Sequence, residues 1–372
     1  MRPSRPPFRA DHVGSLLRPP ALKALRLEAA SGQASAEALA AAEDAAIREV
    51  VRIQEDIGLE GITDGELRRK SWHMDFLLRL GGLTSAGKSL PVTFHGPAGD
   101  LSFIRPDLQI SGRVTRPKPI FVEAFKFLKS VARGTPKLTI PSPCMLYSQV
   151  GRANIDATVY PGLDAFVEDT AAAYRAEIAD LYAAGCRYLQ LDDVSLAYLC
   201  DEEIRAKGRA HGEDPDAQLA LSVKLIRATL RDRPKDLTVC THICRGNFRS
   251  SWRAQGGYAK IADVIFNQMP YDGFFLEFDD ARSGDFSPLG HAPKNVRVVL
   301  GLITTKIGML EKKDDLKRRL EEASKYIPLD RLGVSPQCGF SSTVEGNAVG
   351  VEQQRAKLSL CVELARDVWG GL

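Results

Sequence analysis

The segment Cys240-Thr-His242-Ile-Cys244 has the residue types and the spacing of a metal site. Alternate residues of a β-strand face the same side, so His242 and Cys244 can converge on one point, with Cys240 one layer deeper. Imidazole and thiolate ligands suit Zn²⁺, and a catalytic zinc usually takes three or four protein ligands. Two further donors follow in the chain, Glu277 in FFLEFDD and Cys338 in SPQCGF. The pattern is compatible with a zinc site, and cysteines buried as small hydrophobic residues are the alternative.

The elements that must position these donors alternate between helices and strands. An Ala-rich helix over residues 35–57 ends at a glycine, and a short apolar run with acidic residues at its end follows at 59–66. The same order returns at 163–184 and 186–193. This alternation is typical of an α/β protein built from β/α units.

Eight candidate strands can be assigned along the chain. They cover residues 8–13, 59–63, 137–141, 187–192, 237–242, 274–278, 296–303 and 332–336. Eight parallel strands in sequence most simply close into a (β/α)8 TIM barrel, whose active site lies at the C-terminal ends of the strands. Polar side chains stand at nearly every predicted strand end, which places the candidate metal ligands at the mouth of the barrel.

One region interrupts the alternation. Residues 83–117 contain two extended segments, VTFHG and LQISGRVTRP, separated by PAGDLSFIRPD. They predict a β-hairpin excursion between barrel strands 2 and 3. We interpret it as a flap inserted in a single domain that spans residues 1–372.

Composition excludes several classes of protein. The 372 residues carry 50 Lys and Arg against 47 Asp and Glu, a net charge of +3, so nothing predicts a nucleic-acid partner. The apolar runs fall short of the roughly 20 residues that span a bilayer, and the opening MRPSRPPFRADHVGS lacks the apolar core of a signal peptide. The seven cysteines are scattered, which argues against a disulfide framework. We expect a cytoplasmic protein without a membrane partner and make no prediction of its oligomeric state.

The order of ADHVGSLLRP, ITDGE, LQLDD, THICRGN, FFLEFDD and SPQCG resembles the catalytic barrel of cobalamin-independent methionine synthase and its single-barrel relatives. The resemblance runs from about Ala10 to Gly339. It implies that a zinc ion is held by four ligands, which are His242, Cys244, Glu277 and Cys338. The implied reaction is transfer of a methyl or alkyl group to a thiol bound on that zinc. In the resembling synthase the incoming thiol can replace the glutamate, so Glu277 is expected to be an exchangeable ligand.

The resemblance also implies a set of substrate-binding residues. Those expected to hold the amino-acid end of homocysteine are Val13, Gly14, Ser15, Glu66 and Asp192. Carboxylates suit its α-ammonium group. Trp72 is expected to stack on a pterin ring of the donor or to pack under the flap.

Lys306 and Asp192 are the predicted catalytic residues. Lys306 stands near the place where the synthase has a histidine that assists proton delivery to the leaving group. It can supply that proton if burial lowers its pKa, or it can bind an anionic donor. A lysine paired with a carboxylate in a loop is the alternative.

Three functions remain open at this point. The first is a zinc-dependent methyltransferase that makes methionine from homocysteine, with methyltetrahydrofolate or a methylcorrinoid as the small-molecule donor. The second is alkylation of a zinc-bound thiol, as in the related epoxyalkane:coenzyme M transferases, where a sulfonate calls for a cation such as Arg18 or Lys306. The third is a corrinoid-binding or methyl-carrier partner protein without catalytic activity. Metal content discriminates among them.

Overall fold

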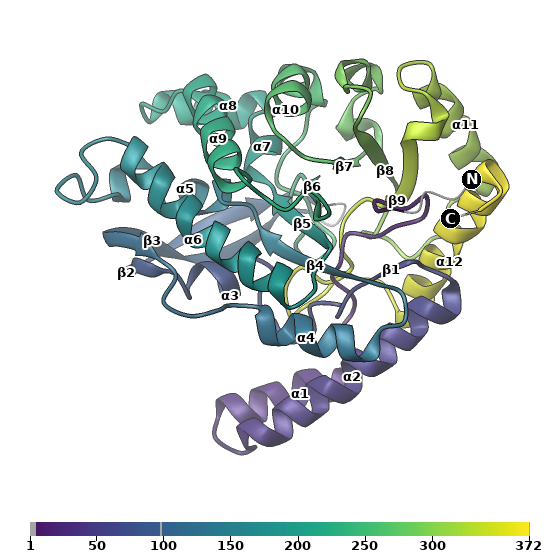
Figure 1. Ribbon diagram of the computed structural model, residues 1–372, viewed down its shortest axis with the longest axis horizontal. Helices are drawn as coiled ribbons and strands as arrows, with labels where there is room; N and C mark the ends of the chain where they lie inside the picture. The colour runs from purple at the N-terminus through teal and green to yellow at the C-terminus, as the bar shows by residue number, and fades with distance from the viewer. Residues whose placement is uncertain (1–4, 97–98, 372) are drawn as a thin grey trace.

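The computed structural model describes residues 5–96 and 99–371, and its centre is a seven-stranded parallel sheet surrounded by helices (Figure 1). The strands follow one another in chain order across the sheet. They are β1 (Gly61–Ile62), β4 (Thr135–Pro141), β5 (Tyr188–Asp193), β6 (Thr238–Ile243), β7 (Gly273–Glu277), β8 (Arg297–Ile303) and β9 (Leu332–Pro336). Each corresponds to a predicted strand, and the prediction of an α/β fold with parallel strands is confirmed.

The strand predicted at 8–13 is not a regular strand in the structure. Ala10 forms an isolated parallel bridge with Val334 of β9, and the Asp11 N–H donates to the Val334 carbonyl at 3.1 Å. Beyond this point the Asp11 carboxylate accepts the N–H of His12 at 2.8 Å. Because this side chain competes for backbone groups, the segment contributes a bridge and not a ladder. The prediction of eight regular barrel strands is therefore wrong in this element.

Helices alternate with these strands. Their bounds are α1 (Pro20–Ala30), α2 (Ala36–Ile57), α3 (Met74–Leu77), α4 (Val122–Val131), α5 (Cys144–Val150), α6 (Asp164–Ala183), α7 (Ser195–Tyr198), α8 (Glu202–Ala210), α9 (Pro215–Thr229), α10 (Ala262–Gln268), α11 (Lys313–Ser324) and α12 (Val351–Trp369). Helix α2 begins where the Ser35 hydroxyl accepts the Ala38 N–H, and it ends at Gly58 with φ 97°. Both helices predicted from the periodic pattern, α2 and α6, are confirmed. None of the helices in the described ranges is long and apolar enough to cross a membrane.

In the chain, a two-stranded antiparallel sheet follows β1 and precedes β4, where the hairpin excursion was predicted. It consists of β2 (Gly81–Phe94) and β3 (Leu101–Thr115), and it begins two residues before the predicted range of 83–117. Its tip contacts the loop after β6, because His95 pairs with Trp252 in an antiparallel bridge. The rings of Phe94 and Phe248 lie 5.4 Å apart at the same contact. The hairpin thus reaches a loop at the C-terminal end of the sheet, and its role as a flap stays a prediction.

Candidate active site

Three potential metal ligands lie together at the C-terminal ends of β6 and β9. The ligand atoms of His242, Cys244 and Cys338 all lie within 4.8 Å of one another, and all three residues are buried. His242 is on β6, Cys244 follows its last residue, and Cys338 follows β9. The two sulfur atoms are 3.3 Å apart. Alternation along β6 therefore turns His242 and Cys244 to one side, as the spacing predicted.

The protonation states of His242, Cys244 and Cys338 are compatible with binding of a cation. Because the Phe275 carbonyl, 3.3 Å away, can only accept, the His242 Nδ1 carries the proton. The Nε2 atom of the neutral ring then has a free lone pair, and it has no hydrogen-bond partner within the described part of the chain. The neighbouring Cys338 thiol and burial raise the pKa of the Cys244 thiol. A buried thiol pair beside a free imidazole nitrogen needs a cation to ionise, and this donor set fits Zn²⁺.

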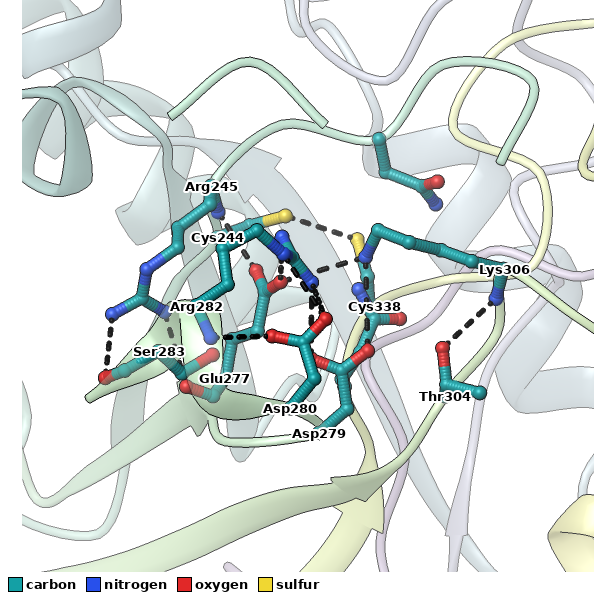
Figure 2. Close-up of polar contacts among 12 residues, drawn as sticks. Cys244, Arg245, Glu277, Asp279, Asp280, Arg282, Ser283, Thr304, Lys306 and Cys338 are labelled. Carbon is teal, nitrogen blue, oxygen red and sulfur yellow. Dashed lines mark hydrogen bonds and ion pairs between the residues drawn. The ribbon is translucent and has the colours of Figure 1, made fainter. Parts of the chain in front are cut away.

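Glu277, the fourth predicted zinc ligand, does not join this group (Figure 2). One carboxylate oxygen accepts the backbone N–H of Arg245 at 2.9 Å. The other lies 3.1 Å from the Arg282 guanidinium and 3.4 Å from the Lys306 ammonium. Although burial opposes ionisation, Lys306, Arg245 and Arg282 lower the pKa of Glu277 to about 2. The carboxylate is thus ionised and bound by cations, and its role as a zinc ligand stays a prediction.

A small cavity is lined by the three metal-binding candidates and by further residues. Its wall includes five of the predicted substrate residues, which are Val13, Ser15, Glu66, Trp72 and Asp192. Gly14 is not part of the wall; its backbone has φ 145°, and a Cβ there would lie 2.7 Å from the Thr139 methyl carbon. Residues far apart in the chain are therefore brought to one small site.

The carboxylates of this cavity are incompletely paired. One oxygen of Glu66 accepts the Thr139 hydroxyl at 2.7 Å, and the other has no partner among the described residues. Glu66 itself has a φ of 57°, in a turn where the Asp64 carboxylate accepts its N–H at 2.8 Å. Such a left-handed residue is strained, and strain of this kind concentrates at functional sites.

Asp192 stands at the end of β5 and accepts the side-chain amide of Gln190 at 2.6 Å. Burial raises its pKa to about 7; His242 acts in the opposite direction, and the nearby Glu66 carboxylate raises it further. The Asp192 carboxyl therefore gains or loses a proton near neutral pH. This property fits a group that binds an ammonium ion or moves a proton.

Two acceptors in the cavity wall were not among the predicted site residues. Asn247 donates its amide to the Gly339 carbonyl at 2.8 Å, which leaves its carbonyl oxygen without a partner in the described ranges. One oxygen of Asp193 is likewise unpartnered there. Asn247 lies three residues after Cys244 in THICRGN, and Asp193 follows Asp192 at the strand end. Position next to a predicted ligand was the only sign of either role in the sequence.

Lys306 was expected either to supply a proton, if burial lowers its pKa, or to be paired with a carboxylate. It is 6% exposed and does not line the cavity. Burial lowers its pKa, but the Glu277 and Asp279 carboxylates outweigh that effect, so the pKa of Lys306 is raised. The structure therefore favours the ion-paired interpretation of Lys306. Lys306 is a charged ion-pair partner at neutral pH.

A second cavity lies next to the first, across the turn between β5 and α7. The Ser195 hydroxyl, in its wall, donates to Asp193 at 2.7 Å, and Asp193 lines the first cavity. Tyr147, Tyr198 and Arg253 are also in this wall, and Arg253 lies 4.6 Å over the Tyr198 ring. This second cavity is the larger of the two, and its wall carries aromatic and cationic side chains.

Comparison with known proteins gives consistent results. The family described as "Cobalamin-independent synthase, Catalytic domain" matches residues 8–367. YxjG of Bacillus subtilis (strain 168), an uncharacterized protein, is 45% identical over 98% of this chain and 96% of its own length. A 5-methyltetrahydropteroyltriglutamate--homocysteine methyltransferase from Synechococcus sp. is 25% identical over 91% of this chain, which spans 41% of that enzyme.

Two solved structures are similar over nearly their whole length. One, from Listeria monocytogenes and assigned to vitamin-B12 independent methionine synthase, has a TM-score of 0.79 and 35% identity, with 98% of each chain covered. Another, a B12-independent methionine synthase from Shewanella sp. W3-18-1, has a TM-score of 0.71 at 19% identity, with 97% of each chain covered, and supports the fold alone. The chain belongs to the family of cobalamin-independent methionine synthase catalytic domains.

Proposed function

We propose that the protein transfers a methyl group to the thiol of homocysteine in a zinc-dependent reaction that yields methionine. One observation carries the proposal: a single cavity is lined both by His242, Cys244 and Cys338 and by the carboxylates of Glu66 and Asp192. Homocysteine has a thiol at one end and an ammonium group at the other, so the cavity matches both. The 25% identity to homocysteine methyltransferases supports the same substrate.

Each end of the acceptor has a defined partner in this proposal. Zn²⁺ held by His242, Cys244 and Cys338 would lower the pKa of the thiol from about 8.5 and so keep the sulfur nucleophilic at neutral pH. Glu66 and Asp192 bind the ammonium group through charge-assisted hydrogen bonds. The Ser15 hydroxyl, also in the wall, is placed to donate to the substrate carboxylate. These contacts orient the sulfur toward the methyl donor.

The ligand types favour sulfur chemistry over hydrolysis. Two thiolates and an imidazole leave a zinc site without net positive charge, which keeps electron density on the substrate sulfur. A hydrolytic zinc that activates water works better with neutral ligands and a cationic metal. The larger neighbouring cavity, with Tyr147 and Arg253 in its wall, is the proposed place of the methyl donor.

Coenzyme M is less compatible with the cavity than homocysteine. Arg18, one candidate for binding its sulfonate, donates to backbone carbonyls, including Ser341 at 2.7 Å and Arg69 at 2.8 Å. The other candidate, Lys306, is paired with Glu277 and Asp279. Neither cation lines the cavity, whereas carboxylates do.

The test combines elemental analysis with X-ray absorption at the zinc edge. We expect about one zinc per chain and one additional sulfur in its coordination sphere after homocysteine is added, with no such change for coenzyme M. Absence of zinc after metal reconstitution would contradict the metal assignment. A sulfur gained only from coenzyme M would contradict the acceptor while leaving the metal site intact.

A further inference from the structure

Two arginines lie where the β2–β3 hairpin meets the loop after β6. Arg105 is on β3, and Arg253 follows Trp252 in that loop. We propose that Arg105 and Arg253 form an anion-binding subsite at the rim of the second cavity, where they hold a negatively charged group of the methyl donor. The binding of an anion does not depend on the metal site, whereas its assignment to the donor rests on the proposed function.

Alternation along β3 turns Arg105 toward the loop after β6. Over residues 101–106 the odd-numbered residues are half-buried and the even-numbered ones are exposed. The ring of Phe103 lies 4.9 Å from the ring of Phe248, which belongs to the loop after β6. Arg105 is two residues further along the strand, so its side chain lies on the same face as that of Phe103.

The two guanidinium groups come to the second cavity from different elements. Arg105 donates to the Gln149 carbonyl at 2.9 Å, at the C-terminal end of α5, which runs beside β3 (Figure 1). Tyr147 of the same helix lines the cavity. Arg253 is itself in the cavity wall, 4.6 Å over the Tyr198 ring. The hairpin supplies one cation and the loop supplies the other, so the subsite exists only where these two segments lie together.

The two positive charges act on each other and have no counter-ion. Burial lowers the pKa of Arg105, and the charge of Arg253 lowers it further. Asp107 has the opposite effect on Arg105, but neither arginine forms an ion pair within residues 5–96 and 99–371. Burial lowers the pKa of the nearby His73 to about 3, and Arg105 acts in the same direction. A bound anion would relieve this repulsion between like charges.

The other charged side chains of the cavity wall already have partners. Arg205 forms an ion pair with Asp216 at 3.0 Å. Glu213 accepts the side-chain amide of Gln218 at 2.9 Å. Among the described residues of the wall, Arg253 is therefore the cation that is left for a ligand.

The chemistry of arginine defines the class of ligand. A planar guanidinium binds a carboxylate or a phosphate through two parallel hydrogen bonds. Both groups occur on the methyl donors considered above, because methyltetrahydrofolate carries glutamate carboxylates and methylcobalamin carries a phosphodiester. The shared feature is an anionic group that lies away from the transferred methyl group.

Titration with two small anions tests the subsite directly. Inorganic phosphate and glutarate, which is glutamate without its amino group, are titrated by calorimetry into chelator-treated protein. We expect one site per chain, and a loss of affinity of about 10-fold or more in Arg105→Met and in Arg253→Met, because each variant removes a charge-assisted contact. Tighter binding of glutarate would support a folate-type donor, and tighter binding of phosphate would support a corrinoid.

Two further variants keep this test decisive. Arg249→Met removes a positive charge from the same loop, where Arg249 is exposed, and should bind both anions within about 2-fold of the wild type. Arg253→Lys keeps the charge but loses the planar fork, so it should retain part of the affinity, and it replaces Arg253→Met if that variant does not fold. A wild type that binds neither anion would overturn the proposal. So would affinities that are unchanged in the Arg105 and Arg253 variants, or reduced as much in Arg249→Met.

Steady-state kinetics tests the assignment to the donor. Arg105→Met and Arg253→Met should raise KM for the methyl donor by about 10-fold and leave KM for homocysteine unchanged. An unchanged KM for the donor in both variants would contradict the assignment. A wild type that transfers no methyl group to homocysteine would refute the proposed function, whereas the anion titrations would still decide whether the subsite exists.

Discussion

The curled sheet encloses two clusters of buried polar side chains, and they differ in how many of their polar atoms have hydrogen-bond or ion-pair partners. The deeper cluster consists of Asp11, Lys137 and Tyr188, all with no exposed surface. The Lys137 ammonium contacts Asp11 at 3.0 Å and the His12 carbonyl at 2.5 Å, and the Tyr188 hydroxyl donates to Asp11 at 2.7 Å. The ammonium also lies 4.0 Å from the centroid of the Phe275 ring. Every charge in this cluster has an internal partner.

The cluster at the cavity is also mostly buried, with Asn247 half-buried, but it has unused acceptors. Within the described part of the chain, one atom each of Glu66, Asp193, His242 and Asn247 lacks a hydrogen-bond partner. Buried polar atoms without partners are rare because each costs free energy. Four of them around one cavity indicate a site that a ligand completes. The comparison separates a polar cluster that supports the fold from one that supports binding.

The largest expected effect comes from breaking the deeper cluster. Lys137→Met leaves the Asp11 carboxylate buried without its cation, and we expect the free energy of unfolding to fall by about 3–5 kcal/mol. Urea denaturation measures this change. The double variant Asp11→Asn/Lys137→Met should recover most of the loss, since neither charge remains. A loss below about 1 kcal/mol in the single variant would mean that this ion pair does not support the fold.

Cys338→Ser tests the cluster at the cavity through the proposed zinc site. We expect zinc affinity to fall by more than about 100-fold and methyl transfer to be lost with it, because the serine hydroxyl is a poor zinc ligand. Cys240→Ser is the matched control, since Cys240 belongs to the same C-x-H-x-C segment but lies in the deeper layer, packed with Tyr188 and Phe275. Elemental analysis should find zinc in Cys240→Ser alone. Retention of zinc in Cys338→Ser would remove this cysteine from the site.

Glu66→Gln tests a carboxylate of the cavity wall. The charge-assisted contact with the substrate ammonium contributes about 1.5–3 kcal/mol, so kcat/KM for homocysteine should fall by about 10–100-fold with zinc content unchanged. The control is 4-mercaptobutyrate, which is homocysteine without its amino group. The wild type and Glu66→Gln should use it equally well. A similar loss with both acceptors would show that Glu66 acts on something other than the ammonium group.

The same comparison explains what the sequence could predict. Residues at the ends of β5, β6 and β9 were found because alternation along a strand and its position in the sheet are local properties. The segment at 8–13 was misjudged because its backbone groups are bound by the Asp11 side chain, a competition that apolar periodicity does not report. For Lys306 the sequence left two interpretations open for a related reason. Its pKa depends on Glu277 and Asp279, and only folding brings them to it.

Binding and stability oppose each other at Asp192. In the folded chain burial raises the pKa of this carboxyl to about 7, from the usual 3.8. Between about pH 4 and pH 7 the folded state therefore holds a proton that the unfolded state has already lost, and stability falls as the pH rises through this window.

Asparagine does not titrate and can still accept the Gln190 amide. Asp192→Asn should therefore match the wild type below about pH 4 and become progressively more stable than it as the pH rises to about 7, because a poorly paired buried charge has been removed. Thermal unfolding of chelator-treated protein across this range measures the difference without a contribution from zinc. If the variant is less stable than the wild type at pH 8, Asp192 stabilises the fold, as the residues of the deeper cluster do. If the variant is more stable but impaired in methyl transfer, this carboxylate serves the ligand and lowers the stability of the fold.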